Sequence, residues 1–376
     1  MAGKWTTAEL VVGNVYDTTF YVNPVDGSPY RYRATHLDGR RAPKVILSDD
    51  ERIRPGSRTR VRLEKVHKPE RADRGWLQVE VLDVLELEIE GIYLDPIVSK
   101  KLQVLLESGL NILLDGPQGS GKTVLAKALA ETLGMEFVFF NCAAVLEATD
   151  FLATIQVRAS DSGSPITDFV STDLRKALLE AGESRKKRYL VFLDELNRCP
   201  EPARNALMPA LDSVRKVFDP VTNSFLSIPD NVQFVAAVNR GRAFSATFGI
   251  DAAQLDRFAP LQVTYLPAEE EVKLLRRRHP EVTRSRVELV VQIANVVRDN
   301  PEVVSGLSVR ATEEACIYLA HPLLESADDD MFAEILKSSF CGRHPGSWNE
   351  PDTDAGIVWR LILDAMDAWR KVKGRR

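Results

Sequence analysis

The chain has 376 residues, which is enough for two or three domains with sizeable cores. Its hydrophobic fraction of 44% and charged fraction of 27% are ordinary for a globular protein, and a net charge of −5 argues against a globally nucleic-acid-binding surface. No apolar run reaches the length of a membrane span, the N-terminus lacks the apolar core of a signal peptide, and four isolated cysteines show neither metal-binding spacing nor disulfide density. A cytoplasmic location is therefore expected.

Residues 1–90 have the pattern of a β-rich domain. Strands are predicted at Val11–Val22, Tyr30–Leu37, Lys44–Leu47, Thr59–Val66 and Gly75–Val84, with Pro, Gly and Asp clusters between them. The period-two alternation of 60–64 and 77–81 is typical of strands with one buried face. Five short strands with long turns suggest a small barrel of the OB type.

A glycine-rich loop follows the first apolar strand of the next region. It fits the pattern G-x-x-x-x-G-K-[ST], and a run of strong helix formers begins directly after it. Glycines let the backbone N–H groups surround a phosphate chain at a helix N-terminus. The alternative, a chance glycine-rich turn, does not explain the strand and the helix on either side. The predicted nucleotide-binding residues are Gly116, Pro117, Gln118, Gly119, Ser120, Gly121, Lys122, Thr123 and Val124. Lys122 is expected to reach the β- and γ-phosphates, and the Thr123 hydroxyl to ligate Mg²⁺.

A second motif lies roughly seventy residues later, where the hydrophobic strand 190–193 ends in two carboxylates. Because side chains alternate along a strand, Asp194 and Glu195 are expected to point in different directions. Asp194 is then expected to hold the waters of Mg²⁺, and Glu195 to polarise the water that attacks the γ-phosphate. An apolar strand followed by Asp-Glu is by itself often only a solvated strand end. Its position after the phosphate loop favours a Walker B element.

Strands and helices alternate from Tyr93 to Leu266. Strands are predicted at Ile112–Leu114, Phe137–Phe140, Tyr189–Leu193, Val232–Val238 and Leu261–Thr264, and helices at Val98–Ser108, Val124–Leu133, Thr172–Ala181 and Pro202–Val214. This alternation is typical of an α/β fold with a parallel sheet covered by helices.

Three more polar residues are candidates for catalysis. Asn239, at the end of an apolar strand, could orient the attacking water or could be a turn residue that caps the strand. Arg257 carries a planar guanidinium suited to phosphate recognition, although a surface ion pair with Asp256 is the simpler alternative. Arg310, at a predicted helix start, could reach the γ-phosphate or could be solvated.

The region after Pro267 is predicted to be helical. A helix with an acidic first turn begins at Ala268, and further helices are predicted at Val287–Val297 and Arg310–Leu319. An amphipathic helix is predicted at Ala355–Lys371.

Taken together, these motifs resemble the AAA+ ATPases and, within them, the MoxR-like branch, to which the CbbQ- and NorQ-type activases are related. The strings that carry the resemblance are Gly116–Thr123, Phe192–Arg198, the family-like AQLDRF of Ala253–Phe258, and Ser308–Ala311, in which Val309 stands where proline is common. The resemblance covers roughly residues 93–340. It implies that Asn239 is the sensor-1 residue, that Arg257 is an arginine finger acting on the neighbouring subunit, and that Arg310 is the sensor-2 arginine.

The same resemblance implies an AAA+ core with a helical lid, ATP and Mg²⁺ as cofactors, a hexameric ring, and a protein substrate with a von Willebrand A-domain partner. We expect four regions: a β-rich domain (1–90), the ATPase core (91–266), the lid (267–340) and a helical extension (341–376). Two insertions, 148–166 and a predicted hairpin at 216–228, match the family's inserts that face the ring pore, or are ordinary surface loops.

Two other functions are compatible with the sequence. Basic residues outnumber acidic ones between Arg31 and Arg74, with Tyr30, Tyr32 and Trp76 within or beside that stretch. Barrels with such faces can bind single-stranded nucleic acid, which would make the chain a nucleic-acid motor, although a solvated strand face or a protein-docking face has the same composition. A nucleotide-gated scaffold without hydrolysis is disfavoured by the complete set of hydrolytic residues.

Overall fold

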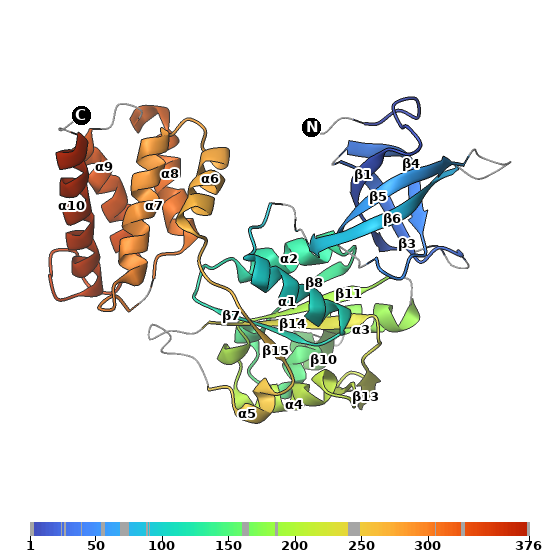
Figure 1. The fold of residues 1–376 in the computed structure, drawn as a ribbon. Coiled ribbons are helices and arrows are strands. Elements are labelled where there is room, and N and C mark those ends of the chain that lie inside the picture. Colours follow the sequence, from blue (N-terminus) through green and yellow to red (C-terminus); the bar gives the residue numbers. More distant parts are fainter. Residues whose placement is uncertain are drawn as a thin grey trace. The chain divides into compact units, whose positions relative to one another are not determined.

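The computed structural model describes residues 4–23, 25, 28–38, 40–53, 57–67, 75–87, 89, 91–159, 165–184, 187–239, 249–304, 306–324 and 328–373 (Figure 1). The chain divides into two compact units. One comprises 1–114, 123–237 and 248–261, and the other comprises 115–122, 238–247 and 262–376. The phosphate loop thus falls in the same unit as the helical C-terminal region.

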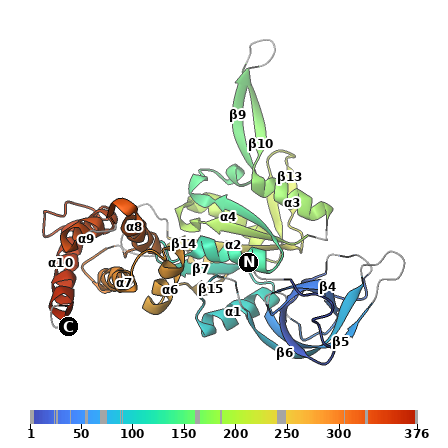
Figure 2. The same cartoon turned by 90° about the horizontal axis from the view of Figure 1, so that it is seen from above.

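The N-terminal region is a six-stranded sheet in the order β1-β5-β6-β4-β3-β2 that curls on itself (Figure 2). Its strands are β1 (Val15–Thr19), β2 (Tyr21–Val22), β3 (Tyr32–Leu37), β4 (Arg40–Ser48), β5 (Ser57–Val66) and β6 (Trp76–Leu87). Alternate side chains such as Ile46, Leu63 and Leu77 fill its core. The predicted strand 11–22 is wrong in its first residues, because Val11 and Val12 are exposed and the chain becomes extended only at Val15. Phe20, fully buried, separates β1 from β2.

The central sheet has five strands in the order β15-β7-β14-β11-β8. They are β7 (Ile112–Gly116), β8 (Glu136–Asn141), β11 (Tyr189–Asp194), β14 (Val232–Asn239) and β15 (Ala259–Gln262). β11 pairs in parallel with both β14 and β8. All eight residues of β14 are buried, as expected for a strand covered on both faces. The predicted α/β class and parallel sheet are confirmed.

Helices connect these strands near the predicted positions. They are α1 (Pro96–Glu107), α2 (Lys122–Thr132), α3 (Asp173–Glu183), α4 (Glu201–Leu211) and the short α5 (Ala252–Leu255). Asp95 caps α1 by accepting hydrogen bonds from the backbone N–H groups of Ile97 and Val98. Thr172 caps α3 in the same way through the Arg175 N–H.

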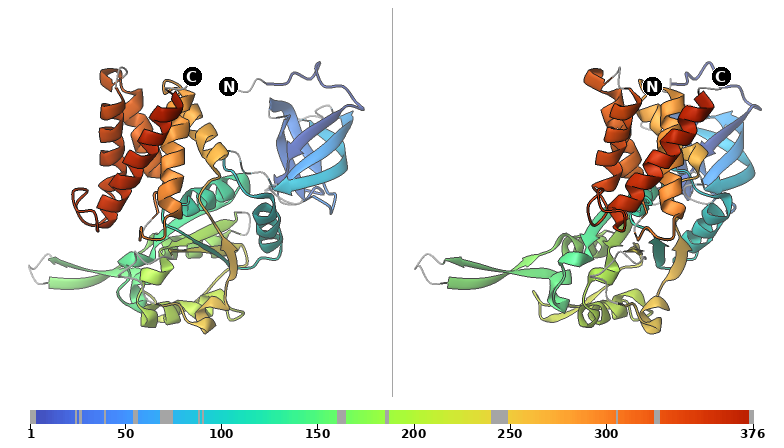
Figure 3. Two further views of the ribbon diagram at one scale, coloured as in Figure 1. Left: turned by 60° about the vertical axis from the view of Figure 1, so that its left-hand side comes forward. Right: turned by 90° about the vertical axis from the view of Figure 1, so that its left-hand side faces the viewer.

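This region also contains two β-hairpins. The predicted hairpin at 216–228 is present as β12 (Lys216–Asp219) and β13 (Ser224–Ser227). The segment 148–166, to which the sequence analysis assigned no strand, begins with a short 3₁₀ turn and continues into β9 (Ala153–Ala159), which pairs antiparallel with β10 (Pro165–Ser171). β9 and β10 extend away from the sheet (Figure 3). Ile155 and Val157 alternate with polar residues, which is the period-two pattern of a strand, but both are exposed, so the alternation marks no core face.

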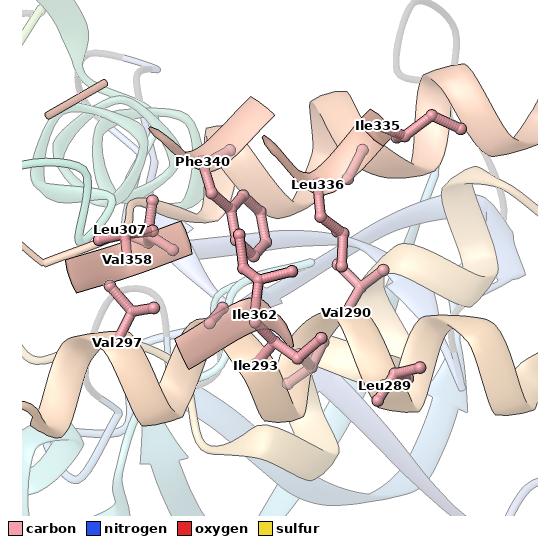
Figure 4. Close-up of a cluster of buried hydrophobic side chains, with 14 of the residues drawn as sticks. Leu289, Val290, Ile293, Val297, Leu307, Ile335, Leu336, Phe340, Val358 and Ile362 are labelled. Carbon is pink, nitrogen blue, oxygen red and sulfur yellow. The ribbon is translucent and has the colours of Figure 1, made fainter. Parts of the chain in front are cut away.

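The C-terminal region is helical and has a hydrophobic core of its own (Figure 4). It contains α6 (Ala268–Arg278), α7 (Arg284–Asp299), α8 (Val309–Ala320), α9 (Asp329–Leu336) with a following π turn (Lys337–Cys341), and α10 (Asp354–Lys373). α9 was not predicted. Val358 and Ile362 of α10 are fully buried beside Val297 and Phe340, so the last helix shares this core. Within the described part of the chain, no helix combines the length and apolar character needed to cross a membrane.

Candidate nucleotide-binding site

The phosphate loop leaves β7 and enters α2 through two glycines in the left-handed region, Gly119 (φ +73°) and Gly121 (φ +87°). Residues with a Cβ rarely adopt this conformation. Gly116 has a different reason to be glycine, because a Cβ there would lie 1.9 Å from the Val263 carbonyl oxygen. The glycines therefore allow both the sharp turns of the loop and its close contact with Val263, directly after β15.

Lys122 is the first residue of α2, and its side chain folds back into the loop. Its Nζ donates hydrogen bonds to the carbonyl oxygens of Gly116 (2.9 Å) and Pro117 (2.7 Å), and the residue is only 6% exposed. The buried Ser120 hydroxyl has no hydrogen-bond partner among the described residues. A buried ammonium and an unsatisfied hydroxyl in the same loop, at a helix N-terminus, fit an anionic group with several acceptor oxygens, as a triphosphate has.

Thr123 lies next on α2 and contacts the end of β11. Its Oγ1 donates to Asp194 Oδ2 at 3.4 Å. Hydroxyl and carboxylate oxygens are the ligands that Mg²⁺ prefers, and Mg²⁺ commonly takes only one or two of them from the protein and the rest from phosphates and water. The described residues contain no group of three or more His, Cys, Asp or Glu side chains that could hold a metal ion, so a metal here would depend on a bound phosphate.

Glu195 follows β11 in the left-handed conformation (φ 52°, ψ 42°). The predicted reason for its orientation was wrong: β11 ends at Asp194, and the chain turns at Glu195 rather than continuing the alternation of a strand. Its N–H donates to Asp194 Oδ1 (3.0 Å), and its Oε2 lies 3.5 Å from Arg198 Nη1. This backbone costs about 1–3 kcal/mol and is typical of functional positions.

Two more of the predicted site residues, Asn239 and Arg257, lie outside the phosphate loop and β11. Asn239 is the last residue of β14 and is buried, while its neighbour Arg240 lies outside the described residues. Arg257 follows α5. Its side chain is 30% exposed, its Nη1 donates to the Ala253 carbonyl oxygen, and its Nη2 lies 3.9 Å from Asp212 Oδ2. The ion pair considered in the sequence analysis, with Asp256, is replaced by this one.

Arg310 lies in the first turn of α8 and is exposed. The residue before that helix, Ser308, is in close contact with the phosphate loop, because a Cβ at Gly119 would lie 2.1 Å from the Ser308 Cβ. Tyr265, which the sequence analysis did not single out, donates its hydroxyl to the Gln118 carbonyl oxygen (3.2 Å). No local sequence signal marks Tyr265, since a lone aromatic residue after a strand is common.

Residues 111–258 match the family model described as AAA domain, dynein-related subfamily. These residues have the AAA+ fold, with the parallel sheet and the flanking helices described above. An uncharacterized protein of Staphylococcus saprophyticus is 30% identical over 175 residues, which are 46% of this chain and 63% of that protein. The uncharacterized protein YojN of Bacillus subtilis is 26% identical over 258 residues, which are 65% of this chain and 80% of YojN. This chain thus spans less than two thirds of the length of the staphylococcal relative.

Among solved structures, the RuvB Holliday junction branch migration motor of Thermotoga maritima is similar, with a TM-score of 0.40 and 17% identity. The similarity covers 64% of this chain and 68% of RuvB.

Proposed function

We propose that the chain hydrolyses ATP with Mg²⁺ as part of a ring, a hexamer by resemblance to MoxR-like proteins, and uses that energy to remodel or activate a partner protein. The observation that carries the proposal is the buried Lys122 ammonium inside the glycine loop, followed directly by the Thr123–Asp194 oxygen pair. Phosphoryl transfer requires little beyond such positioning and charge neutralisation.

Each residue then has a defined role. Residues 116–124 bind the phosphates, with Lys122 facing the β- and γ-phosphates. Thr123 and Asp194 would hold Mg²⁺, which supplies charge neutralisation at the phosphates when bound. Glu195 polarises the attacking water, and Asn239 orients it.

Two arginines would report whether the γ-phosphate is present. Arg257 is partly exposed, and its one carboxylate partner, Asp212, is as far away as 3.9 Å. Its guanidinium can therefore leave Asp212 for a nucleotide on the neighbouring subunit. Arg310 reaches the γ-phosphate from the start of α8. Hydrolysis removes the contacts of both arginines, which changes the relative stability of two conformations, as coupling requires.

A protein partner is supported by the hairpin β9–β10. Ile155 (58% exposed), Val157 (70%) and Phe169 (44%) are apolar yet open to solvent, and Ile155 lies directly opposite Phe169. Contiguous exposed apolar side chains of this kind mark contacts with other proteins. A von Willebrand A-domain protein is the partner that the MoxR resemblance proposes. A reducing cytoplasm is consistent with the four cysteines, all free and buried.

The role of Glu195 can be tested with Glu195→Gln, which keeps the size of the side chain and removes its charge. We expect ATP binding within about twofold of the wild type and turnover reduced by about 10²–10⁴-fold, because general bases contribute about that much. Binding is measured with a labelled ATP analogue and turnover by phosphate release. A variant that loses binding instead, or a wild-type chain that neither binds nor hydrolyses ATP, would contradict the proposal.

A nucleic-acid role for the N-terminal sheet is less well supported, because four of its described arginines pair with acids of the same sheet or its flanks. Trp76 is likewise already in contact with His67 (ring centroids 4.0 Å apart) and Tyr30 (4.6 Å). This arrangement favours the solvated strand face among the alternatives from the sequence. The ion pairs are Arg40–Glu9, Arg52–Asp50, Arg60–Asp17 and Arg62–Glu80.

A further inference from the structure

A buried ion pair joins the first two helices of the C-terminal region. Arg298 of α7 donates from Nη1 to Glu271 Oε2 (2.6 Å) and from Nη2 to Glu271 Oε1 (3.0 Å), in the two-pronged geometry that only arginine provides. The side chains are 4% and 0% exposed. Such a pair is weak evidence for stability, since apolar residues often serve as well. The reason for the Arg298–Glu271 pair is therefore sought in the other contacts of these two side chains.

Those contacts extend to the start of α8. The Thr312 hydroxyl of α8 donates to Glu271 Oε1 (2.6 Å), and Arg298 Nε donates to the Leu307 carbonyl oxygen (2.7 Å). Leu307 directly precedes Ser308, the residue that touches Gly119 of the phosphate loop. Arg298 and Glu271 thus hold both the first turn of α8 and the loop residue Leu307 that leads into it.

A second route runs from Arg298 to the phosphate loop through Tyr265. The Arg298 guanidinium lies over the Tyr265 ring, 4.6 Å from its centroid, and the Tyr265 hydroxyl donates to the Gln118 carbonyl oxygen. Burial raises the pKa of Tyr265 although Arg298 opposes the shift, so the phenol stays a proton donor. Gly306 makes room for it, since a Cβ there would lie 2.9 Å from the hydroxyl.

Both routes lie within one compact unit of the chain, and both end on the backbone of the phosphate loop. We infer that Tyr265 and Arg298 are positioning residues, which fix the start of α8 against the loop so that Arg310 meets the γ-phosphate. The inference rests on the proposed ATP hydrolysis. Neither residue is expected to touch the reacting atoms, and both would act through Arg310.

A double-mutant cycle on the full chain tests the inference. Arg298→Lys keeps the charge but loses the two-pronged geometry, and Arg310→Ala removes the residue being positioned. We expect Arg298→Lys to lower kcat about tenfold in the wild-type background. In the Arg310→Ala background it should lower kcat less than about twofold, because the side chain that Arg298 positions is already absent. Arg284→Lys, on the same helix but exposed and paired with Glu288, is the matched control and should change kcat less than twofold in both backgrounds.

Tyr265→Phe gives a second arm in case Arg298→Lys fails to fold, because it removes one hydroxyl and keeps the ring. It should raise the KM for ATP and lower kcat in the wild-type background, with the kcat effect again absent beside Arg310→Ala. Equal losses of kcat in both backgrounds for the folded variants would overturn the positioning role and leave the proposed function standing. A wild-type chain without ATP hydrolysis would overturn both.

Discussion

At the scale of single residues, the candidate site depends on backbone conformations that few side chains tolerate. Gly119 and Gly121 have positive φ in the phosphate loop, and Glu195 has positive φ at the end of β11. A glycine at such a position removes the conformational cost, whereas Glu195 keeps a carboxylate in spite of it. Glycine fits the phosphate loop, which must expose its N–H groups. Glutamate fits position 195, where the carboxylate itself is needed.

The contact between Gly119 and Ser308 can be tested with Gly119→Ala. The variant combines a left-handed alanine with a clash against the Ser308 Cβ, so its free energy of unfolding should fall by more than the roughly 1–2 kcal/mol expected for a left-handed residue alone. Gly134→Ala is the control, because Gly134 has φ +62° with open space around it. Adding Ser308→Gly should recover part of the loss in chemical denaturation. Equal losses for Gly119→Ala and Gly134→Ala would refute the contact.

At the scale of elements, one arginine joins the two hairpins to the AAA domain. Arg175 of α3 donates to both carboxylate oxygens of Asp219, at the end of β12, at 2.9 and 2.8 Å. It also donates to the Ser171 hydroxyl at the end of β10 (3.0 Å). A displacement of either hairpin therefore acts on the same side chain, and α3 fixes the base of both.

The Arg175–Asp219 pair should make stability depend on acid pH. Burial alone raises the pKa of Asp219, but hydrogen bonds from Arg175, Thr222 and the Val221 N–H outweigh it and hold that pKa below its ordinary 3.8. A lowered pKa contributes stability that is complete above the ordinary value and is lost as the pH falls below it. Asp219→Asn should therefore cost about 3 kcal/mol near pH 7, because it leaves Arg175 without its charge partner.

The measurement for this pair is urea denaturation between pH 7 and pH 2, where the difference between the wild type and Asp219→Asn should shrink below pH 3.8. Glu288→Gln, which breaks the exposed pair with Arg284, is the control and should change the free energy by less than about 1 kcal/mol. A difference that stays constant over this range would show that the carboxylate is not stabilised in the folded state.

At the scale of the whole molecule, the role proposed for Arg257 requires a second copy of the chain. Arg257 has only a 3.9 Å carboxylate partner and a backbone carbonyl contact, and its Nε is buried without a hydrogen bond among the described residues. A guanidinium with some of its N–H groups still without hydrogen bonds is suited to change partners when a phosphate arrives from a neighbouring subunit.

Mixing two inactive variants tests the contribution of Arg257 from the neighbouring subunit. Arg257→Ala keeps the phosphate loop and Glu195, while Glu195→Gln keeps the arginine. Each variant alone should hydrolyse ATP slowly. An equimolar mixture at ring-forming concentration should hydrolyse ATP well above the sum of the two separate rates, because some subunit interfaces then combine an intact Glu195 with an intact Arg257. Phosphate release reports the rate. A mixture no faster than its components, or Arg257→Ala with full activity, would exclude this role.

The ion-paired arginines of the N-terminal sheet give a further prediction for the whole chain. The full chain should bind single-stranded DNA or RNA weakly, with little change between 50 and 200 mM salt, because Arg52, Arg60 and Arg62 of the N-terminal sheet already pair with Asp50, Asp17 and Glu80. Fluorescence anisotropy of a labelled oligonucleotide measures it. Tight binding that weakens steeply with salt would favour the nucleic-acid motor instead.

The sequence by itself determined the features that depend on neighbours along the chain. The strand–loop–helix unit around Lys122, the carboxylates that end β11, the hairpin turned at Pro220 and the amphipathic α10 all follow from patterns of a few to twenty residues. Such patterns report local conformation and burial, which are properties of short segments.

Only the tertiary structure decided which distant residues meet. The Thr123–Asp194 pair, the Arg257–Asp212 pair and the Tyr265–Gln118 hydrogen bond join residues 45 to 147 positions apart in the chain. The left-handed conformation of Glu195 and the solvent exposure of Ile155 and Val157 on β9 also could not be read from the sequence. These contacts depend on how strands and helices pack together, and the packing is a property of the whole fold rather than of any one segment.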